Sequence, residues 1–224
     1  MKIKFNFLLV LAIVAVAFVS CTDDGTTPGK VEPSTSYIIN YGGYTEDKST
    51  ITSYDKETET VINGVYTGVN GVAMTSNAQH ALSYNGNVYF MGNNSDKIFW
   101  VDSETFVQTE NSISADIVKP RYAVASGNYL YVSCWGGDVW ADHSVSYVAK
   151  VNLTSKSVEK KIALHGGPEG LEIVNNQLYA ALNYIDSVAV IDLGTETVSY
   201  IAMDQGNIPS YFKKDKNDNL YVCL

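Results

Sequence analysis

The chain has 224 residues, of which 46% are hydrophobic and 12% aromatic, and its formal net charge at pH 7 is −9. The acidic balance, without clustered Lys and Arg, argues against a nucleic-acid surface or a basic membrane patch. Cys134 and Cys223 are expected to be buried free thiols, because the repeats over 36–224 place them on opposite sheet faces and two blades apart, where a disulfide between them is not expected. These features are typical of an ordinary soluble domain with an acidic surface.

The first 20 residues have the pattern of a secretory signal, because Lys2 and Lys4 precede an apolar run over 5–19. The run approaches the roughly 20 residues that cross a bilayer, so an uncleaved anchor is the alternative. Its ending, Phe18-Val19-Ser20-Cys21, resembles a bacterial lipobox. We therefore expect a signal peptide over 1–20, lipidation of Cys21, and membrane attachment by the lipid alone.

The next segment, 21–35, is predicted to be a flexible tether, because Gly and Pro alternate there with Thr, Ser and Lys. It begins with Thr22-Asp23-Asp24, which resembles the surface-export signal of lipoproteins in the Bacteroidota. The alternative is that these acidic residues only belong to a solvated linker. The predicted location is the outer membrane, with the domain exposed at the cell surface.

The remaining residues, 36–224, contain repeats of four short segments rich in Val, Ile, Tyr and Thr, separated by tight turns. The clearest repeat spans 168–203. A tyrosine after the first turn recurs at steps of 42, 48 and 42 residues, as Tyr89, Tyr131, Tyr179 and Tyr221. A turn after the third segment recurs at Asp55, Asp102, Asn152 and Asp192. This period predicts an all-β fold, a β-propeller of four-stranded antiparallel blades.

About four blades are visible. The first supplies three strands, over 36–40, 49–55 and 59–66, and lacks an innermost strand before them. The last residues supply a candidate inner strand at 209–216 and the beginning of another strand at 219–224. We expect the chain to be a fragment of a larger ring. The alternative is a four-bladed ring in which 211–214 closes the first blade.

A binding site would lie where the turns into the innermost strands meet the loops between second and third strands. The turns into the innermost strands place Gln79, Arg121, Glu169 and Ser210 at equivalent positions, with Tyr122 and Tyr211 beside them. The loops include 183–186, which carries Tyr184, and a long insertion over 135–144 with Trp135, Asp138, Trp140 and His143.

The insertion could serve recognition, since exposed aromatic side chains on loops of a rigid scaffold bind ligands. Alternatively, its two tryptophans only pack the loop onto the blade. The spacing of Asp138, Asp142 and His143 matches no known metal site, so no metal is expected.

No catalytic residues and no cofactor are predicted, because the sequence has no glycine-flanked nucleophilic serine, no His-Glu pair at helical spacing and no phosphate loop. His80 and His165 are expected to be structural. Arg121 and Glu169 lie in adjacent blades, where an ion pair is an alternative to an acid and a base.

The chain resembles the YncE-like seven-bladed β-propeller surface lipoproteins of the Bacteroidota. The motifs that carry the resemblance are Pro120-Arg121-Tyr122, Tyr131-Val132-Ser133-Cys134-Trp135, Asn93-Asn94-Ser95 and Pro168-Glu169-Gly170. The family includes a lipoprotein that captures vitamin B12 for an outer-membrane transporter. The resemblance implies a corrinoid or another scarce nutrient as ligand, and it assigns no contact residue.

Three functions follow as hypotheses. The first is a non-enzymatic, surface-anchored binding protein whose partners are a small-molecule nutrient and an outer-membrane transporter. The second is a structural or protein-interaction propeller without a small ligand. The third is an enzyme, such as a propeller lyase or lactonase, which would need acidic residues at several of the equivalent turn positions.

Overall fold

The computed structural model describes residues 35–43, 48–74 and 76–224, which form one unit. The predicted signal peptide, Cys21 and all but the last residue of the predicted tether lie outside the described residues. Of the described residues, none lies in a helix long and apolar enough to cross a bilayer.

The repeat over 168–203 forms one antiparallel sheet in sequence order, as predicted. Its strands are β12 (Pro168–Val174), β13 (Gln177–Leu182), β14 (Ser187–Asp192) and β15 (Val198–Ala202). The tight turn between β12 and β13 is possible because Asn175 and Asn176 adopt positive φ angles of 49° and 62°, the conformation of a two-residue hairpin turn.

Two further sheets repeat this order. One contains β4 (Ala78–Tyr84), β5 (Asn87–Gly92), β6 (Lys97–Asp102) and β7 (Gln108–Ile113). The other contains β8 (Pro120–Ser126), β9 (Tyr129–Cys134), β10 (Tyr147–Asn152) and β11 (Ser157–Ala163). The all-β architecture of four-stranded antiparallel blades is therefore confirmed.

The two end sheets of the described part are smaller. β1 (Thr35–Asn40), β2 (Thr50–Asp55) and β3 (Val61–Ile62) form a three-stranded sheet, and α1 (Val65–Asn70) follows. The expected third strand is present, but its predicted end at residue 66 was wrong, because the chain turns into α1 at Gly64, which has a left-handed conformation. β16 (Tyr211–Lys214) pairs with β17 (Leu220–Cys223) and not with β1, so closure of the first blade by 211–214 was also wrong.

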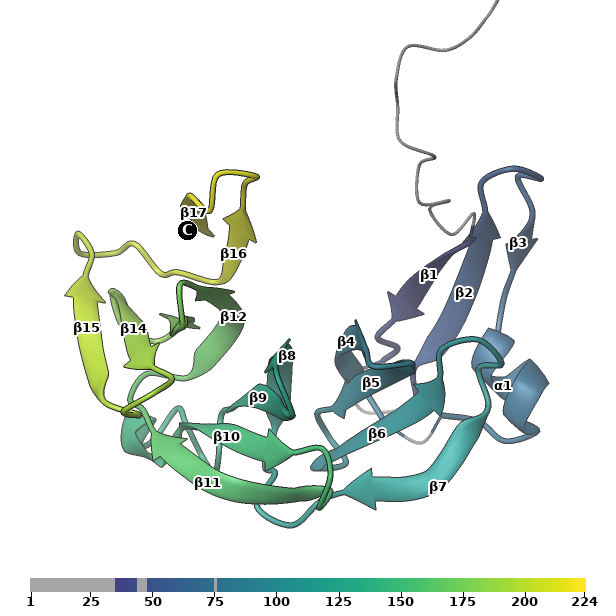
Figure 1. The fold of residues 1–224 in the computed structure, drawn as a ribbon, viewed down its shortest axis with the longest axis horizontal. Helices are drawn as coiled ribbons and strands as arrows, with labels where there is room; N and C mark the ends of the chain where they lie inside the picture. The colour runs from purple at the N-terminus through teal and green to yellow at the C-terminus, as the bar shows by residue number, and fades with distance from the viewer. Residues whose placement is uncertain (1–34, 44–47, 75) are drawn as a thin grey trace, which may run out of the picture. The chain divides into compact units, whose positions relative to one another are not determined.

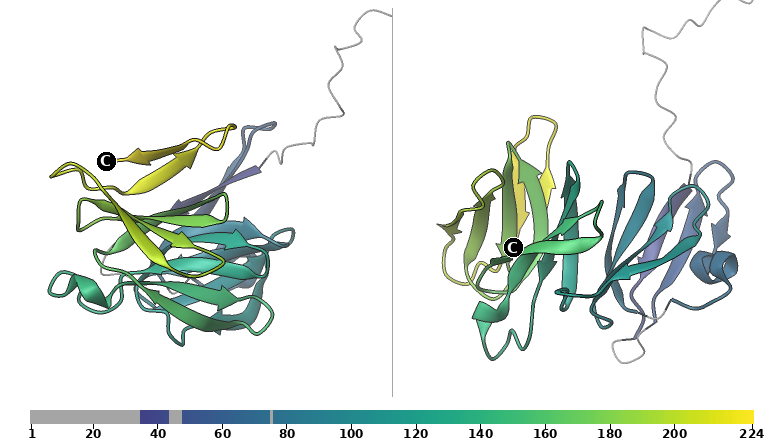
Figure 2. Two further views of the ribbon diagram at one scale, coloured as in Figure 1. Left: turned by 60° about the vertical axis from the view of Figure 1, so that its left-hand side comes forward. Right: turned by 60° about the horizontal axis from the view of Figure 1, so that its bottom comes forward.

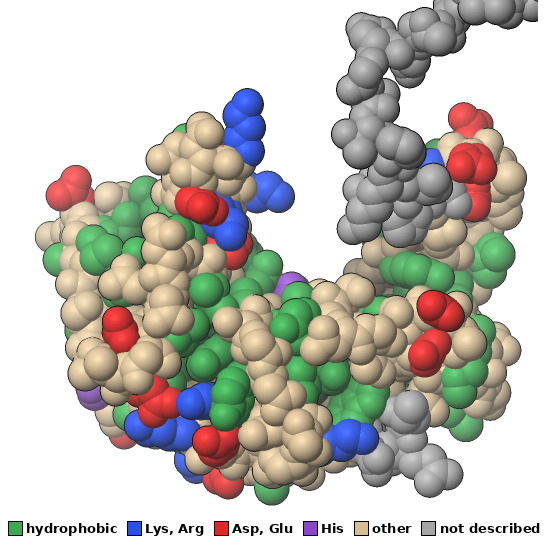
Figure 3. Space-filling view, viewed as in Figure 1, with side chains coloured by type: hydrophobic (Ala, Val, Ile, Leu, Met, Phe, Trp, Pro, Cys, Tyr) green, Lys and Arg blue, Asp and Glu red, His purple; other side chains and the backbone are tan. Residues whose placement is uncertain are grey.

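The first strands of successive sheets are neighbours: β4 contacts β8, β8 contacts β12, and β12 contacts β16. Figures 1 and 2 show the sheets of 35–224 following one another with these strands on the inner side. Buried side chains such as Trp100 and Leu130 fill the space between adjacent sheets. Figure 3 shows hydrophobic side chains gathered there, with charged side chains toward the turns.

Both described cysteines are free, as expected. Cys134 is buried, and burial raises the pKa of its thiol to about 12. The expectation that Cys223 is also buried was wrong, since it lies exposed on β17 and no described residue covers it.

Candidate functional site

The turns into the inner strands and the loops between second and third strands lie at one end of the sheets, which we call the mouth face. Three predicted residues meet there through hydrogen bonds that cross from blade to blade. Arg121 donates from Nη1 to Gln79 Oε1 at 3.2 Å. It also forms a forked ion pair with Glu169, through Nη2 to Oε1 at 2.7 Å and through Nε to Oε2 at 2.9 Å. The ion-pair interpretation is confirmed.

The third blade-to-blade contact comes from Tyr211, whose hydroxyl donates to Glu169 Oε1 at 3.2 Å. Ser210, the residue predicted by spacing, instead accepts a hydrogen bond from Asn183 Nδ2 at 3.1 Å. We call Gln79, Arg121, Glu169 and Tyr211 the polar belt. It joins the inner strands of four successive blades.

The belt is largely removed from water. The side chains of Arg121 and Glu169 are 14% and 6% exposed, so their fork is a nearly desolvated, charge-assisted pair. A guanidinium has five N–H donors. Within the belt, Arg121 donates one N–H from each of its three nitrogens, Nε, Nη1 and Nη2. One N–H on Nη1 and one on Nη2 therefore remain for another partner.

An aromatic cluster, composed of Trp135, Trp140, Tyr184 and His143, stands beside the belt. The Arg121 guanidinium lies 4.0 Å from the centre of the Trp135 ring. Trp135 makes edge contacts with Trp140 at 5.6 Å and Tyr184 at 5.4 Å. His143 lies 5.5 Å from Tyr184. The long loop of one blade therefore packs on the Asn183–Asp186 loop of the next.

The two tryptophans have different environments. The Trp135 indole Nε1 is buried and has no hydrogen-bond partner among the described residues. Trp140 is 54% exposed although it contacts the cluster. Burial also raises the pKa of the Tyr184 hydroxyl above its ordinary value. Trp135 therefore packs the loop onto the blade, whereas more than half of Trp140 is accessible to solvent.

The acidic residues of the loop stabilise its turns. Asp142 Oδ1 accepts hydrogen bonds from the Ser144 hydroxyl at 2.6 Å and from the Ser144 backbone N–H at 2.8 Å, and both lower the pKa of Asp142. Asp138 Oδ1 accepts from the Ala141 backbone N–H at 3.3 Å. Among the described residues, no three His, Cys, Asp or Glu side chains form a group that could hold a metal ion.

Lys119 belongs to the mouth face, although the sequence did not single it out. Its ammonium group lies 5.1 Å from the Trp140 ring centre and donates to the Gly137 carbonyl at 2.8 Å. Only its position just before Pro120, in the turn into β8, could have indicated this.

Two cavities lie along the inner strands, and the first of them is lined by two residues of the belt. One of about 390 Å³ is lined by Ile39, Tyr41, Ala78, Gln79 and Arg121. The contribution of the first blade, Ile39 and Tyr41, was not predicted, because the distance between these loops is not visible in the sequence. The second cavity, of about 400 Å³, lies along β4, β8 and β12 and includes His80, Tyr122, Glu172 and Lys214.

His80 and Tyr122 form the wall of the second cavity. Their rings stack with centres 3.6 Å apart, and His80 Nδ1 accepts from the Ala123 backbone N–H at 3.3 Å. Burial lowers the pKa of His80 to about 4. The imidazole is therefore neutral at pH 7 and oriented by the backbone.

The sequence matches no family model, and no curated protein matches it. Several solved structures match the fold. They include a virginiamycin B lyase from Staphylococcus aureus, with 13% identity, a TM-score of 0.56, and coverage of 79% of this chain and 56% of that protein.

A putative 6-phosphogluconolactonase from Bacteroides uniformis ATCC 8492 matches with 13% identity and a TM-score of 0.61, and the match covers 84% of this chain and 60% of that protein. A streptogramin B lyase gives 12% identity, a TM-score of 0.57, and coverage of 85% and 67%. The chain thus spans less than two thirds of the first two proteins. At such low identity these likenesses concern the fold alone, and the described chain has the fold of a β-propeller.

Proposed function

We propose that the protein is a non-enzymatic ligand-binding propeller whose site is the mouth face. The observation that carries this proposal is the position of Arg121. Its guanidinium lines a cavity of about 390 Å³ while Glu169, Gln79 and the Trp135 ring hold it in place. A fixed donor at a concave surface binds ligand with little loss of side-chain entropy.

The surroundings of Arg121 favour a ligand that combines a flat apolar surface with hydrogen-bond acceptors. Trp140 presents an exposed ring, and such rings stack on planar groups and on sugar faces. Two N–H groups of Arg121 and the Lys119 ammonium could supply donors nearby. Corrinoids and glycans both have this chemistry.

The arrangement of the belt favours binding over catalysis. The Glu169 carboxylate accepts hydrogen bonds from Arg121 and Tyr211, so it is held as a structural acceptor and not as a free base. Likeness in fold to lyases and a putative lactonase does not transfer their reactions, because propellers host many functions.

We further propose that Cys21 carries a lipid that anchors the propeller to the outer membrane, facing the cell exterior. The support is the sequence ending Phe18-Val19-Ser20-Cys21, followed by Asp23 and Asp24. In that setting, the ligand would be a scarce nutrient that is passed to an outer-membrane transporter. Incorporation of labelled palmitate that is abolished by Cys21→Ala tests the anchor separately.

Calorimetric titration with cyanocobalamin, and then with a panel of glycans, tests the binding proposal. We expect saturable one-to-one binding of one of these ligands, weakened about fivefold by Trp140→Ala, since an aromatic contact is worth on the order of 1 kcal/mol. Tyr200→Ala is the control, because Tyr200 is also an exposed aromatic residue, 46% accessible on β15.

No binding by any of these compounds would overturn the nutrient proposal. It would favour the second candidate, a protein-interaction propeller, for which exposed Trp140 would be a contact residue.

A further inference from the structure

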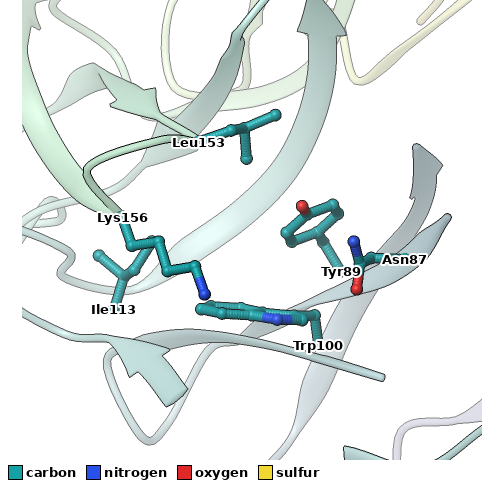
Figure 4. A pocket seen from close by; sticks show the side chains of 6 residues that line it. All are labelled: Asn87, Tyr89, Trp100, Ile113, Leu153 and Lys156. Carbon is teal, nitrogen blue, oxygen red and sulfur yellow. The ribbon is translucent and has the colours of Figure 1, made fainter. Parts of the chain in front are cut away.

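A separate cavity lies between two blades, away from the polar belt. It measures about 220 Å³ and is lined by Asn87, Tyr89, Trp100, Ile113, Leu153 and Lys156. The first four residues come from the sheet β4–β7, and the last two from the turn between β10 and β11. Figure 4 shows the six side chains around a common space.

We call this cavity the side pocket. Its inner lining is apolar and buried. Tyr89, Trp100 and Ile113 are 6%, 4% and 5% exposed. The ring centres of Tyr89 and Trp100 lie 5.7 Å apart and the ring planes are inclined by 44°, so the two rings meet as a corner. Buried rings that face an empty space lose the dispersion contacts that a packed neighbour would provide. A flat molecule in the corner would supply those contacts.

The rim of the side pocket carries a positive charge. The Lys156 ammonium lies 5.3 Å from the Trp100 ring centre (Figure 4), and it makes no ion pair within the described part of the chain. Lys156 occupies the turn with a φ of 53°. A cation held over a ring face at the pocket edge is a natural partner for a carboxylate.

We propose that the side pocket binds a small aromatic monocarboxylate. The ring would lie against Trp100 and Tyr89, and the carboxylate would meet the Lys156 ammonium at the rim. A volume of about 220 Å³ suits a molecule of one or two rings, because drug-sized ligands occupy roughly 300 Å³ or more. This site does not depend on the mouth face.

The test uses the three tryptophan indole N–H signals of the purified protein in a nitrogen–proton NMR spectrum. The Trp100 signal is identified by its absence from Trp100→Phe. Titration with benzoate and with indole-3-carboxylate is expected to shift the Trp100 signal saturably and to leave the signals of Trp135 and Trp140 in place. Neutral benzamide is expected to bind about tenfold more weakly, which corresponds to the loss of one charge-assisted contact.

Two variants locate the binding. Lys156→Met keeps the aliphatic stem and removes the charge, so it should weaken benzoate about tenfold while leaving benzamide unchanged. Leu153→Phe fills the space and should abolish binding of both. The matched control is Lys97→Met, because Lys97 lies 5.4 Å from the Phe99 ring centre in the same sheet and does not line the pocket.

The proposal is overturned if neither carboxylate shifts the Trp100 signal in the folded wild-type protein. It is also overturned if Leu153→Phe, shown to be folded by an unchanged circular dichroism melt, binds like the wild type. Should Leu153→Phe not fold, the benzoate-to-benzamide ratio in Lys156→Met decides, because an unchanged ratio contradicts the assigned contact. Arg121→Lys, at the mouth face, should leave this titration unaffected, so the two sites can fail separately.

Discussion

The two ends of the sheets differ in how they use their turns. At the end opposite the mouth face, one turn recurs in each blade. Asp55, Asp102, Asn152 and Asp192 accept hydrogen bonds at Oδ1 from the backbone N–H groups two and three residues later, at 2.8–3.1 Å. At the mouth face, each blade contributes a different residue, and these residues bond to one another across blades.

This difference separates the residues that repeat the fold from those that distinguish this protein. A turn closed by its own Asx side chain is local and can be copied from blade to blade. The polar belt depends on neighbours 42 or 48 residues away in the chain. Substitutions at the two ends should therefore have effects of different size and kind.

The largest effect is expected from Glu169→Ala. Removing the carboxylate leaves the Arg121 guanidinium nearly buried and unpaired, so the free energy of unfolding should fall by about 3 kcal/mol. Urea denaturation measures this. The control is Asp116→Asn, which removes the charge that pairs with Lys161 and suits the positive φ of 60° at this position. The side chains of Asp116 and Lys161 are 55% and 49% exposed, so the change should cost less than about 1 kcal/mol. Equal losses would contradict the assignment of the belt as a buried network.

Gly170→Ala should have the next largest effect. A Cβ at Gly170 would lie 2.7 Å from the Ser210 carbonyl oxygen and 2.8 Å from Tyr211 Cα, so β16 would have to move away from β12. We expect a loss of about 2 kcal/mol, typical of overpacking. Gly137→Ala is the matched control, because no atom lies within 4 Å of its Cβ position. A neutral result for Gly170→Ala would show that the two strands are not tightly joined.

Smaller, pH-dependent effects are expected at the opposite end. Backbone hydrogen bonds to the carboxylates lower the pKa of Asp102 and of Asp192 below the ordinary value. Their contribution to stability is therefore present above the unfolded-state pKa, near 4, and is lost as pH falls through the lower folded-state pKa.

Asp192→Asn provides a test, since Asn152 performs the same task in another blade. The melting temperature of Asp192→Asn should equal that of the wild type at pH 7 and should fall less than the wild type's as the pH is lowered to 2. Asp192→Ala should instead lower the melting temperature at neutral pH. Melts followed by circular dichroism between pH 2 and 7 would show both. If the melting temperature of Asp192→Asn depended on pH as steeply as that of the wild type, this account would be contradicted.

The smallest stability effect is expected for Trp140→Ala. Because the ring is 54% exposed, the free energy of unfolding should change by less than about 0.5 kcal/mol, while ligand affinity falls. A large loss of stability would instead assign Trp140 to packing of the loop.

The sequence allowed the blades to be predicted because their signals are local and repeated. The Tyr and Asx positions, with the apolar alternation between them, define strand and turn within a single hairpin. The third strand of the first sheet was predicted to end too late, because the residues up to Tyr66 are compatible with a strand, whereas Gly64 permits the turn into α1. Local propensity does not decide between these outcomes.

The mouth face was predictable only in part. Topology brought Arg121 and Glu169 together, because equivalent positions on adjacent inner strands must be neighbours. It did not distinguish Ser210 from Tyr211, since a one-residue shift at the start of β16 exchanges which side chain reaches Glu169. Lys119 and the side pocket depend on distances between loops and blades, which no local pattern encodes.

The central claim is that ligand capture occurs at the mouth face. The most direct test follows the same three tryptophan indole signals while the protein is titrated with the nutrient that binds in calorimetry, beginning with cyanocobalamin. We predict that the Trp140 and Trp135 signals shift in proportion to saturation while the Trp100 signal stays in place. Saturation without any shift of Trp135 or Trp140 would contradict the claim.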